Sequence, residues 1–123
     1  MADSLYLSST DIIKQIFTGF SVDGVAVPVV HSYYFGHGET YITYEQVDTA
    51  GSFAGDDELL GFVEYYDFDV YSRDGDTAVI SAMANLLGQY MFMFQPSRSS
   101  GDMYEPDTGY HHRVLNFAYL REA

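Results

Sequence analysis

The sequence predicts a single domain of the α+β class, in which an antiparallel sheet of about four strands carries two helices on one face. Two observations lead to this prediction. The side chains of residues 61–72 alternate between two faces over the length of a long strand. An apolar stripe at helical spacing follows at residues 79–94. The chain has 123 residues and shows no internal repeat or linker, so residues 1–123 are expected to form one unit.

The composition excludes several classes of protein. The chain is 47% hydrophobic and 17% aromatic, which predicts a folded core. Its 18 acidic and five basic residues give a net charge of -13, which opposes binding to nucleic acid. The absence of cysteine excludes disulfides, thiol nucleophiles and thiolate metal sites. No export signal or membrane span is expected, because the chain lacks a basic leader and any run of about 18 apolar residues.

The N-terminal part predicts a short helix followed by an edge strand. Side-chain oxygens at residues 8–11 can cap a helix over residues 10–18, whose stability must come from docking. Its apolar stripe comprises Ile12, Ile13, Ile16, Phe17 and Phe20. Residues 25–34 are β-branched and aromatic, but Pro28 has no N–H to donate, which favours an edge strand or an extended arm.

The next segment predicts a strand and then a loop. The side chains of residues 41–47 alternate between a largely apolar face and a mixed face, which predicts a strand. This strand is expected to end near Asp48. Residues 49–57 contain glycine, alanine, serine and acidic residues, which favours a mobile loop or hairpin turn. The candidate mobile positions are Gly51, Phe53, Asp56 and Asp57.

Residues 61–72 are expected to form the central strand and to lead into the main helix. Its core face comprises Phe62, Tyr66, Phe68 and Val70, and its reverse face Val63, Tyr65, Asp67, Asp69 and Tyr71. Residues 73–76 form a turn in which Asp74 or Asp76 caps the helix. The helix stripe comprises Val79, Ile80, Met83, Leu86, Leu87, Tyr90, Met91 and Phe94, and Pro96 ends it.

The C-terminal part predicts a long loop and a closing strand. Residues 95–108 are rich in serine, glycine, aspartate and proline, with a short strand at residues 103–104. Residues 110–121 alternate with apolar side chains on both faces, as expected for a strand with neighbours on each side.

The polar residues define no catalytic, metal or cofactor site. Asp67 and Asp69 project from the same face, which suits a hard cation or an acid/base pair, although such pairs are more typical of a solvated or subunit-facing surface. His111 and His112 are adjacent on a strand and point to opposite faces. A small ligand-binding domain or enzyme using Asp67 and Asp69, and an acidic interaction module, remain alternatives to a structural protein.

The aromatic residues favour contact with other chains. Twelve tyrosines exceed what so small a core can hold, and tyrosine is common at protein interfaces. The reverse face of the central strand has no helix left to cover it. The candidate subunit interface comprises Tyr41, Tyr65, Asp67, Asp69, Tyr71, Arg113 and Tyr119.

The order of these elements resembles the tail-terminator, or tail-completion, family of siphophages and their prophages, a family of minor tail proteins. The similar pieces are the N-terminal helix, the strands at residues 40–46 and 65–72, the long apolar helix, and the closing strand at residues 113–119. Related head–tail connector proteins share such short patterns. The similarity covers most of the chain.

The resemblance implies a structural protein without enzymatic activity. Members of that family assemble as rings, commonly hexamers, which close the tail tube where it meets the head. The implied partners are further copies of the chain, the major tail tube protein and the head–tail connector proteins, with DNA passing through without specific binding. The implied location is the virion tail, after assembly in the cytoplasm of the bacterial host.

Overall fold

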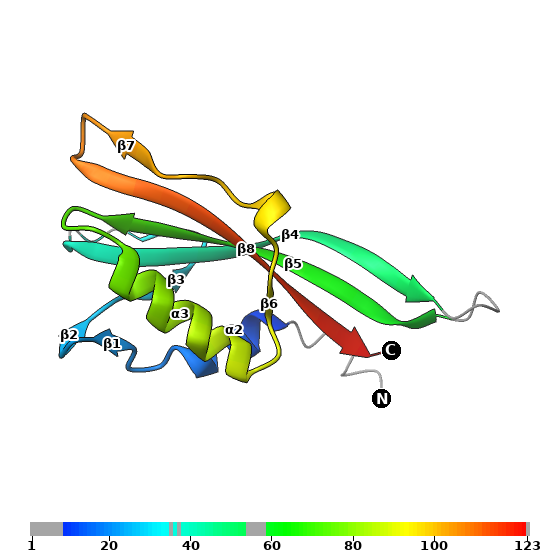
Figure 1. Ribbon diagram of the computed structural model, residues 1–123. Coiled ribbons are helices and arrows are strands. Elements are labelled where there is room, and N and C mark those ends of the chain that lie inside the picture. The colour runs from blue at the N-terminus through cyan, green and yellow to red at the C-terminus, as the bar shows by residue number, and fades with distance from the viewer. Residues whose placement is uncertain (1–8, 35, 37, 54–58, 123) are drawn as a thin grey trace.

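The computed structural model describes residues 9–34, 36, 38–53 and 59–122. The fold is mixed α and β, as predicted, with two helices in the described part of the chain (Figure 1). The elements are α2 (Ser9–Ile16), β1 (Ser21–Val22), β2 (Val25–Ala26), β3 (Val29–His31), β4 (Thr40–Phe53), β5 (Leu59–Ser72), α3 (Thr77–Gln89), β6 (Met93–Phe94), the 3₁₀ helix η1 (Pro96–Arg98), β7 (Met103–Glu105) and β8 (Tyr110–Glu122).

The main sheet has six strands rather than about four. Its order is β3-β4-β5-β8-β6, and β7 also pairs with β8. The additional strands are two or three residues long, and β3 pairs with β4 in parallel, so the sheet is not wholly antiparallel. The edge position predicted from Pro28 is confirmed, because β3 follows this proline directly at one margin of the sheet.

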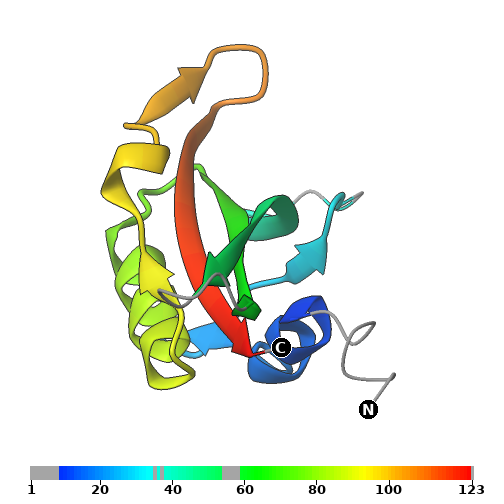
Figure 2. The same ribbon diagram turned by 90° about the vertical axis from the view of Figure 1, so that its right-hand side faces the viewer.

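The core lies between one face of the sheet and both helices. Phe68 is fully buried, and its ring meets those of Phe17, Tyr44 and Phe117 at centroid distances of 6.2, 5.9 and 5.5 Å. Phe17 directly follows α2, whereas Tyr44 and Phe117 belong to β4 and β8, so one side chain joins three parts of the chain to β5. Figures 1 and 2 both place α2 and α3 low in the view and β7 at the top. We call the covered side of the sheet the helix face and the other side the outer face.

The main helix is shorter than predicted. It ends at Gln89, where the expected stripe continued to Phe94. Met91 has a positive φ of 71°, and the N–H of Phe92 donates to the carbonyl of Leu87 at 3.0 Å, which reverses the chain. Phe92 is then buried and β6 pairs with β8, so strand hydrogen bonds replace a further helical turn.

The predicted helix cap is also wrong in its chemistry. Asp76 does occupy the N-cap position of α3, but its side chain makes no hydrogen bond to the helix. Its carboxylate instead accepts a hydrogen bond from Nε of Arg113 at 3.1 Å. An ion pair with β8 therefore holds the start of α3 against the sheet.

The strand predicted to end near Asp48 continues to Phe53. A register shift between Gln46 and Asp48 interrupts the alternation, and the pairing with β5 resumes at Asp48 and Tyr65. Gly51 and Phe53 are therefore strand residues and not loop residues, whereas Asp56 and Asp57 lie outside the described residues. Residues 46–53 of β4 and 59–65 of β5 form an arm that projects beyond the body of the molecule (Figure 1), and β8 pairs with the β5 side of this arm as far as Gly61.

Candidate interaction surface

The outer face carries a stack of three rings across three strands. Tyr41 of β4 stacks on Tyr71 of β5, with ring centroids 4.6 Å apart and planes 15° apart. Tyr71 stacks in turn on His112 of β8, at 4.2 Å and 18°. The three residues are direct cross-strand neighbours, so the registers of two hairpin-like pairings build the stack. The ring of Tyr110 makes edge contacts with the rings of both Tyr41 and Tyr71.

The structure brings five of the seven candidate interface residues together. Tyr41, Tyr65, Asp67, Asp69 and Tyr71 share the outer face, as the alternation of the strands predicts. They are partly rather than fully exposed.

Arg113 and Tyr119 do not join this group. They belong to the alternate positions of β8, which lie on the helix face. Arg113 pairs with Asp76, and the ring of Tyr119 stacks on Phe92 at 4.6 Å. Their partners come from α3 and from the turn after it, which a pattern within one strand does not reveal.

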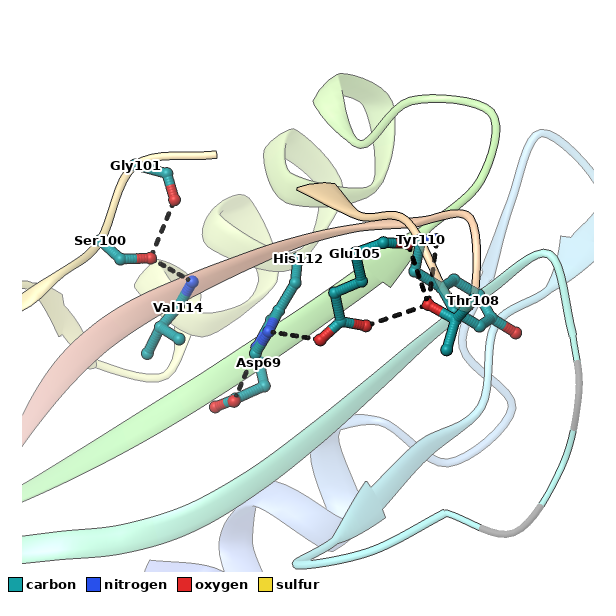
Figure 3. A network of polar contacts seen from close by, with 8 residues as sticks. All are labelled: Asp69, Ser100, Gly101, Glu105, Thr108, Tyr110, His112 and Val114. Atoms are coloured by element: carbon teal, nitrogen blue, oxygen red, sulfur yellow. Dashed lines mark hydrogen bonds and ion pairs between the residues drawn. The ribbon is translucent and has the colours of Figure 1, made fainter. Parts of the chain in front are cut away.

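Asp69 belongs to a chain of polar contacts centred on His112 (Figure 3). Nε2 of His112 lies 2.9 Å from Oδ2 of Asp69, and Nδ1 lies 3.7 Å from Oε2 of Glu105. The hydroxyl of Thr108 donates to the other carboxylate oxygen of Glu105 at 3.2 Å. The imidazole thus bridges two acidic side chains, one from β5 and one from β7.

Burial raises the pKa values of Asp69 and Tyr71 on this face. Desolvation raises the pKa of Asp69 above its ordinary value, while the hydrogen bond and charge of His112 act in the opposite direction. Desolvation, assisted by the negative charge of Asp69, raises the pKa of Tyr71 to about 12. Tyr71 therefore remains neutral at physiological pH and contributes to the surface as a ring and a hydroxyl.

The carboxylates of Asp67 and Asp69 lie on the same face but accept hydrogen bonds from different side chains. Asp67 accepts a hydrogen bond from the side-chain amide of Asn116 at 2.8 Å, whereas Asp69 is bound to His112. The two carboxylates therefore have separate partners. Within the described ranges, no three histidine or acidic side chains gather as a metal ion requires.

The segment predicted as a long loop lies along the free edge of β8. The backbone N–H groups of Gln95 and Ser100 donate to carbonyls of β8, and the hydroxyls of Ser99 and Ser100 accept N–H groups from it. The guanidinium of Arg98 lies 3.7 Å from the ring centroid of Tyr65. Part of the outer face is therefore covered, although no local pattern in residues 95–108 signals this role.

The pH dependence of the free energy of unfolding reports the protonation state of Asp69. Because its folded pKa is raised, the folded protein binds more protons between the unfolded and folded pKa values, and stability falls as pH rises through that window. We expect wild type to lose stability relative to Asp69→Asn as the pH rises above 3.8, the ordinary pKa of an aspartate carboxyl. Urea unfolding at low protein concentration measures this, since the pI is about 4.2.

Asp107→Asn is the matched control, because it removes the same charge from an exposed site. Its stability difference from wild type should change little over that pH range. A wild-type to Asp69→Asn difference that stays constant or grows with pH would contradict the assignment.

No family model matches this chain, and no curated protein matches it significantly. Among the described residues, no helix is long and apolar enough to cross a membrane.

Proposed function

We propose that this protein is a structural virion component of a long-tailed phage or prophage, which forms a ring that closes the head-proximal end of the tail tube and joins tail to head. The proposal starts from the resemblance of the chain to the tail-terminator family. In this role the chain catalyses no reaction and binds no cofactor. Its partners are further copies of itself, the major tail tube protein and the head–tail connector proteins.

The observation that carries the proposal is the unpaired edge of the arm. β3 pairs with β4 only at residues 42–44, and residues 45–51 of β4 are exposed on a strand with no outer neighbour in the described part of the chain. An open strand edge invites pairing with another chain. In a ring, each arm reaches the adjacent protomer, which covers this edge.

The charge of the chain suits a conduit for DNA. All four arginines already make contacts within the chain: Arg73 with Tyr110, Arg98 with Asp48, Arg113 with Asp76 and Arg121 with Glu64. Few cations remain for phosphate groups, and a net charge of -13 per protomer repels them. DNA would therefore pass through such a ring without being held.

Native mass spectrometry tests the proposal. We expect a closed oligomer, with a hexamer as the ring size that the resemblance implies, and we expect it to bind purified tail tube assemblies. A protein that stays monomeric at high concentration and does not bind tail tubes would contradict the proposal. Arm variants such as Val47→Asp, at a half-exposed position of β4, should weaken the oligomer without unfolding the body.

A further inference from the structure

Exposed apolar side chains gather where α3 ends. The side chains of five residues are exposed there: Tyr90 (49%), Met91 (75%), Met93 (55%), Phe94 (47%) and Leu120 (50%). They are half of the ten large hydrophobic side chains that are exposed in the described ranges. An exposed apolar group of this kind marks a contact with another molecule. We call these five residues the knob.

The knob is uncharged in a strongly acidic protein. The adjoining hollow, of about 710 Å³, is lined by Met91, Met93 and Leu120 together with Arg121, and there is no carboxylate among the described residues that line it. Copies of a chain with a net charge of -13 repel one another, so they associate at the lowest electrostatic cost through a surface without carboxylates. The knob is such a surface.

An apolar groove lies at the other end of α3. Its volume is about 570 Å³, and it is lined by Val22 and Val25 of the β1–β2 hairpin and by Ala78 and Val79 of the first turn of α3. Val25 is 67% exposed, which leaves the groove open to an apolar side chain. We call this the groove.

The knob and the groove are different surfaces at opposite ends of one helix. The 13 residues of α3 separate them by about 20 Å, and Figure 1 shows β1 and β2 near the start of α3 and β6 near its end. A contact between a knob and a groove is therefore head-to-tail. Repetition of such a contact generates a ring if the rotation closes.

We propose that the knob of one copy of this chain occupies the groove of the next copy. This inference rests on the proposed ring and names a contact that would build it together with the arm. The exposed carboxylates of Asp23, Glu39 and Asp74 also line the groove, and they repel most of the acidic surface of another copy. The five side chains of the knob carry no charge, so the knob is compatible with this groove in both polarity and charge.

Two variants remove the two halves of the contact. Met91→Asp/Met93→Asp places carboxylates on the knob, and Val25→Asp places one in the groove. Both change exposed side chains, so the fold should persist, which circular dichroism verifies. We expect each variant to be monomeric at concentrations where wild type is oligomeric, with at least about a tenfold weaker association for each anchor lost. Met103→Asp, at an exposed position on β7, is the matched control and should assemble as wild type does.

Mixing the two variants distinguishes a head-to-tail contact from every other arrangement. The knob variant keeps its groove and the groove variant keeps its knob, so an equimolar mixture should form a dimer of one copy of each that cannot extend. Native mass spectrometry detects this species at twice the monomer mass, and isotope labelling of one variant shows that it contains both. A mixture that remains monomeric overturns the inference.

Other outcomes separate this inference from the proposed function. If wild type is oligomeric and the folded knob or groove variant assembles equally well, the contact is wrong while the ring proposal stands. If Met103→Asp also dissociates the oligomer, the effect is one of added charge and the inference fails. A wild-type protein that is monomeric throughout overturns the ring and this contact together.

Discussion

Replacing Phe68 by alanine is expected to lower the free energy of unfolding by about 3 to 5 kcal/mol, the cost of removing a buried phenylalanine. Phe68 has no exposed surface, and its ring contacts Phe17 just after α2, Tyr44 of β4 and Phe117 of β8. The change removes the side chain that holds these elements to β5 and leaves a cavity between them. The midpoint of urea unfolding, followed by circular dichroism, measures the loss.

Two further variants make this result interpretable. Phe68→Leu retains most of the side-chain volume and should cost clearly less, about 1 to 1.5 kcal/mol, even if the alanine variant does not fold. Val47→Ala, at a site that is 45% exposed, should change the stability by less than about 0.5 kcal/mol. Equal losses for Phe68→Ala and Val47→Ala would show that Phe68 is not at the centre of the core.

Replacing Arg121 by methionine is expected to destabilise the protein by about 2 to 3 kcal/mol, because it leaves the carboxylate of Glu64 buried without its cation. Glu64 is only 5% exposed, and its Oε1 lies 3.7 Å from Arg121 and accepts a hydrogen bond from Ser9 at 3.0 Å. The separation of 3.7 Å makes this pair weaker than a tightly paired buried one, which would cost about 3 to 5 kcal/mol.

The double variant Glu64→Gln/Arg121→Met provides the control for this prediction. It removes both charges while keeping an acceptor for Ser9, so it should recover most of the stability lost in Arg121→Met. Urea unfolding of wild type, both single variants and the double variant yields the coupling energy between the two sites. If the double variant is less stable than Arg121→Met, the loss comes from packing of the arginine stem and not from an unpaired charge.

The sequence predicts those parts of the fold that depend on local periodicity. The burial of Tyr66, Phe68 and Val70 on β5 follows from a period of two, and that of Met83 and Leu87 on α3 follows from the helical period. The edge position of β3 follows from Pro28. Each of these features depends on neighbours in the sequence, which a single chain displays.

The predictions are wrong where a segment pairs with a distant strand instead of forming the structure that its own pattern predicts. The apolar stripe that ends in Met91 and Phe94 fits a longer helix, but pairing between β6 and β8 stabilises a turn and a strand there instead. The alternation of β4 stops at Val47, yet the bulge lets the strand continue alongside β5. In both cases the partner strand supplies hydrogen bonds that the segment itself does not display.

The candidate interaction surface could likewise be predicted only in part. Alternation places Tyr41, Asp69 and Tyr71 on one face, but their partners on β8 come from residues about 40 positions or more away in the chain. The sequence by itself determined the apolar faces of β5 and α3, the acidic charge and the excess of tyrosine. Only the tertiary structure decided the histidine–carboxylate contacts, the cover over β8, the arm and the exposed knob, because strand register and chain reversal depend on pairing between distant segments.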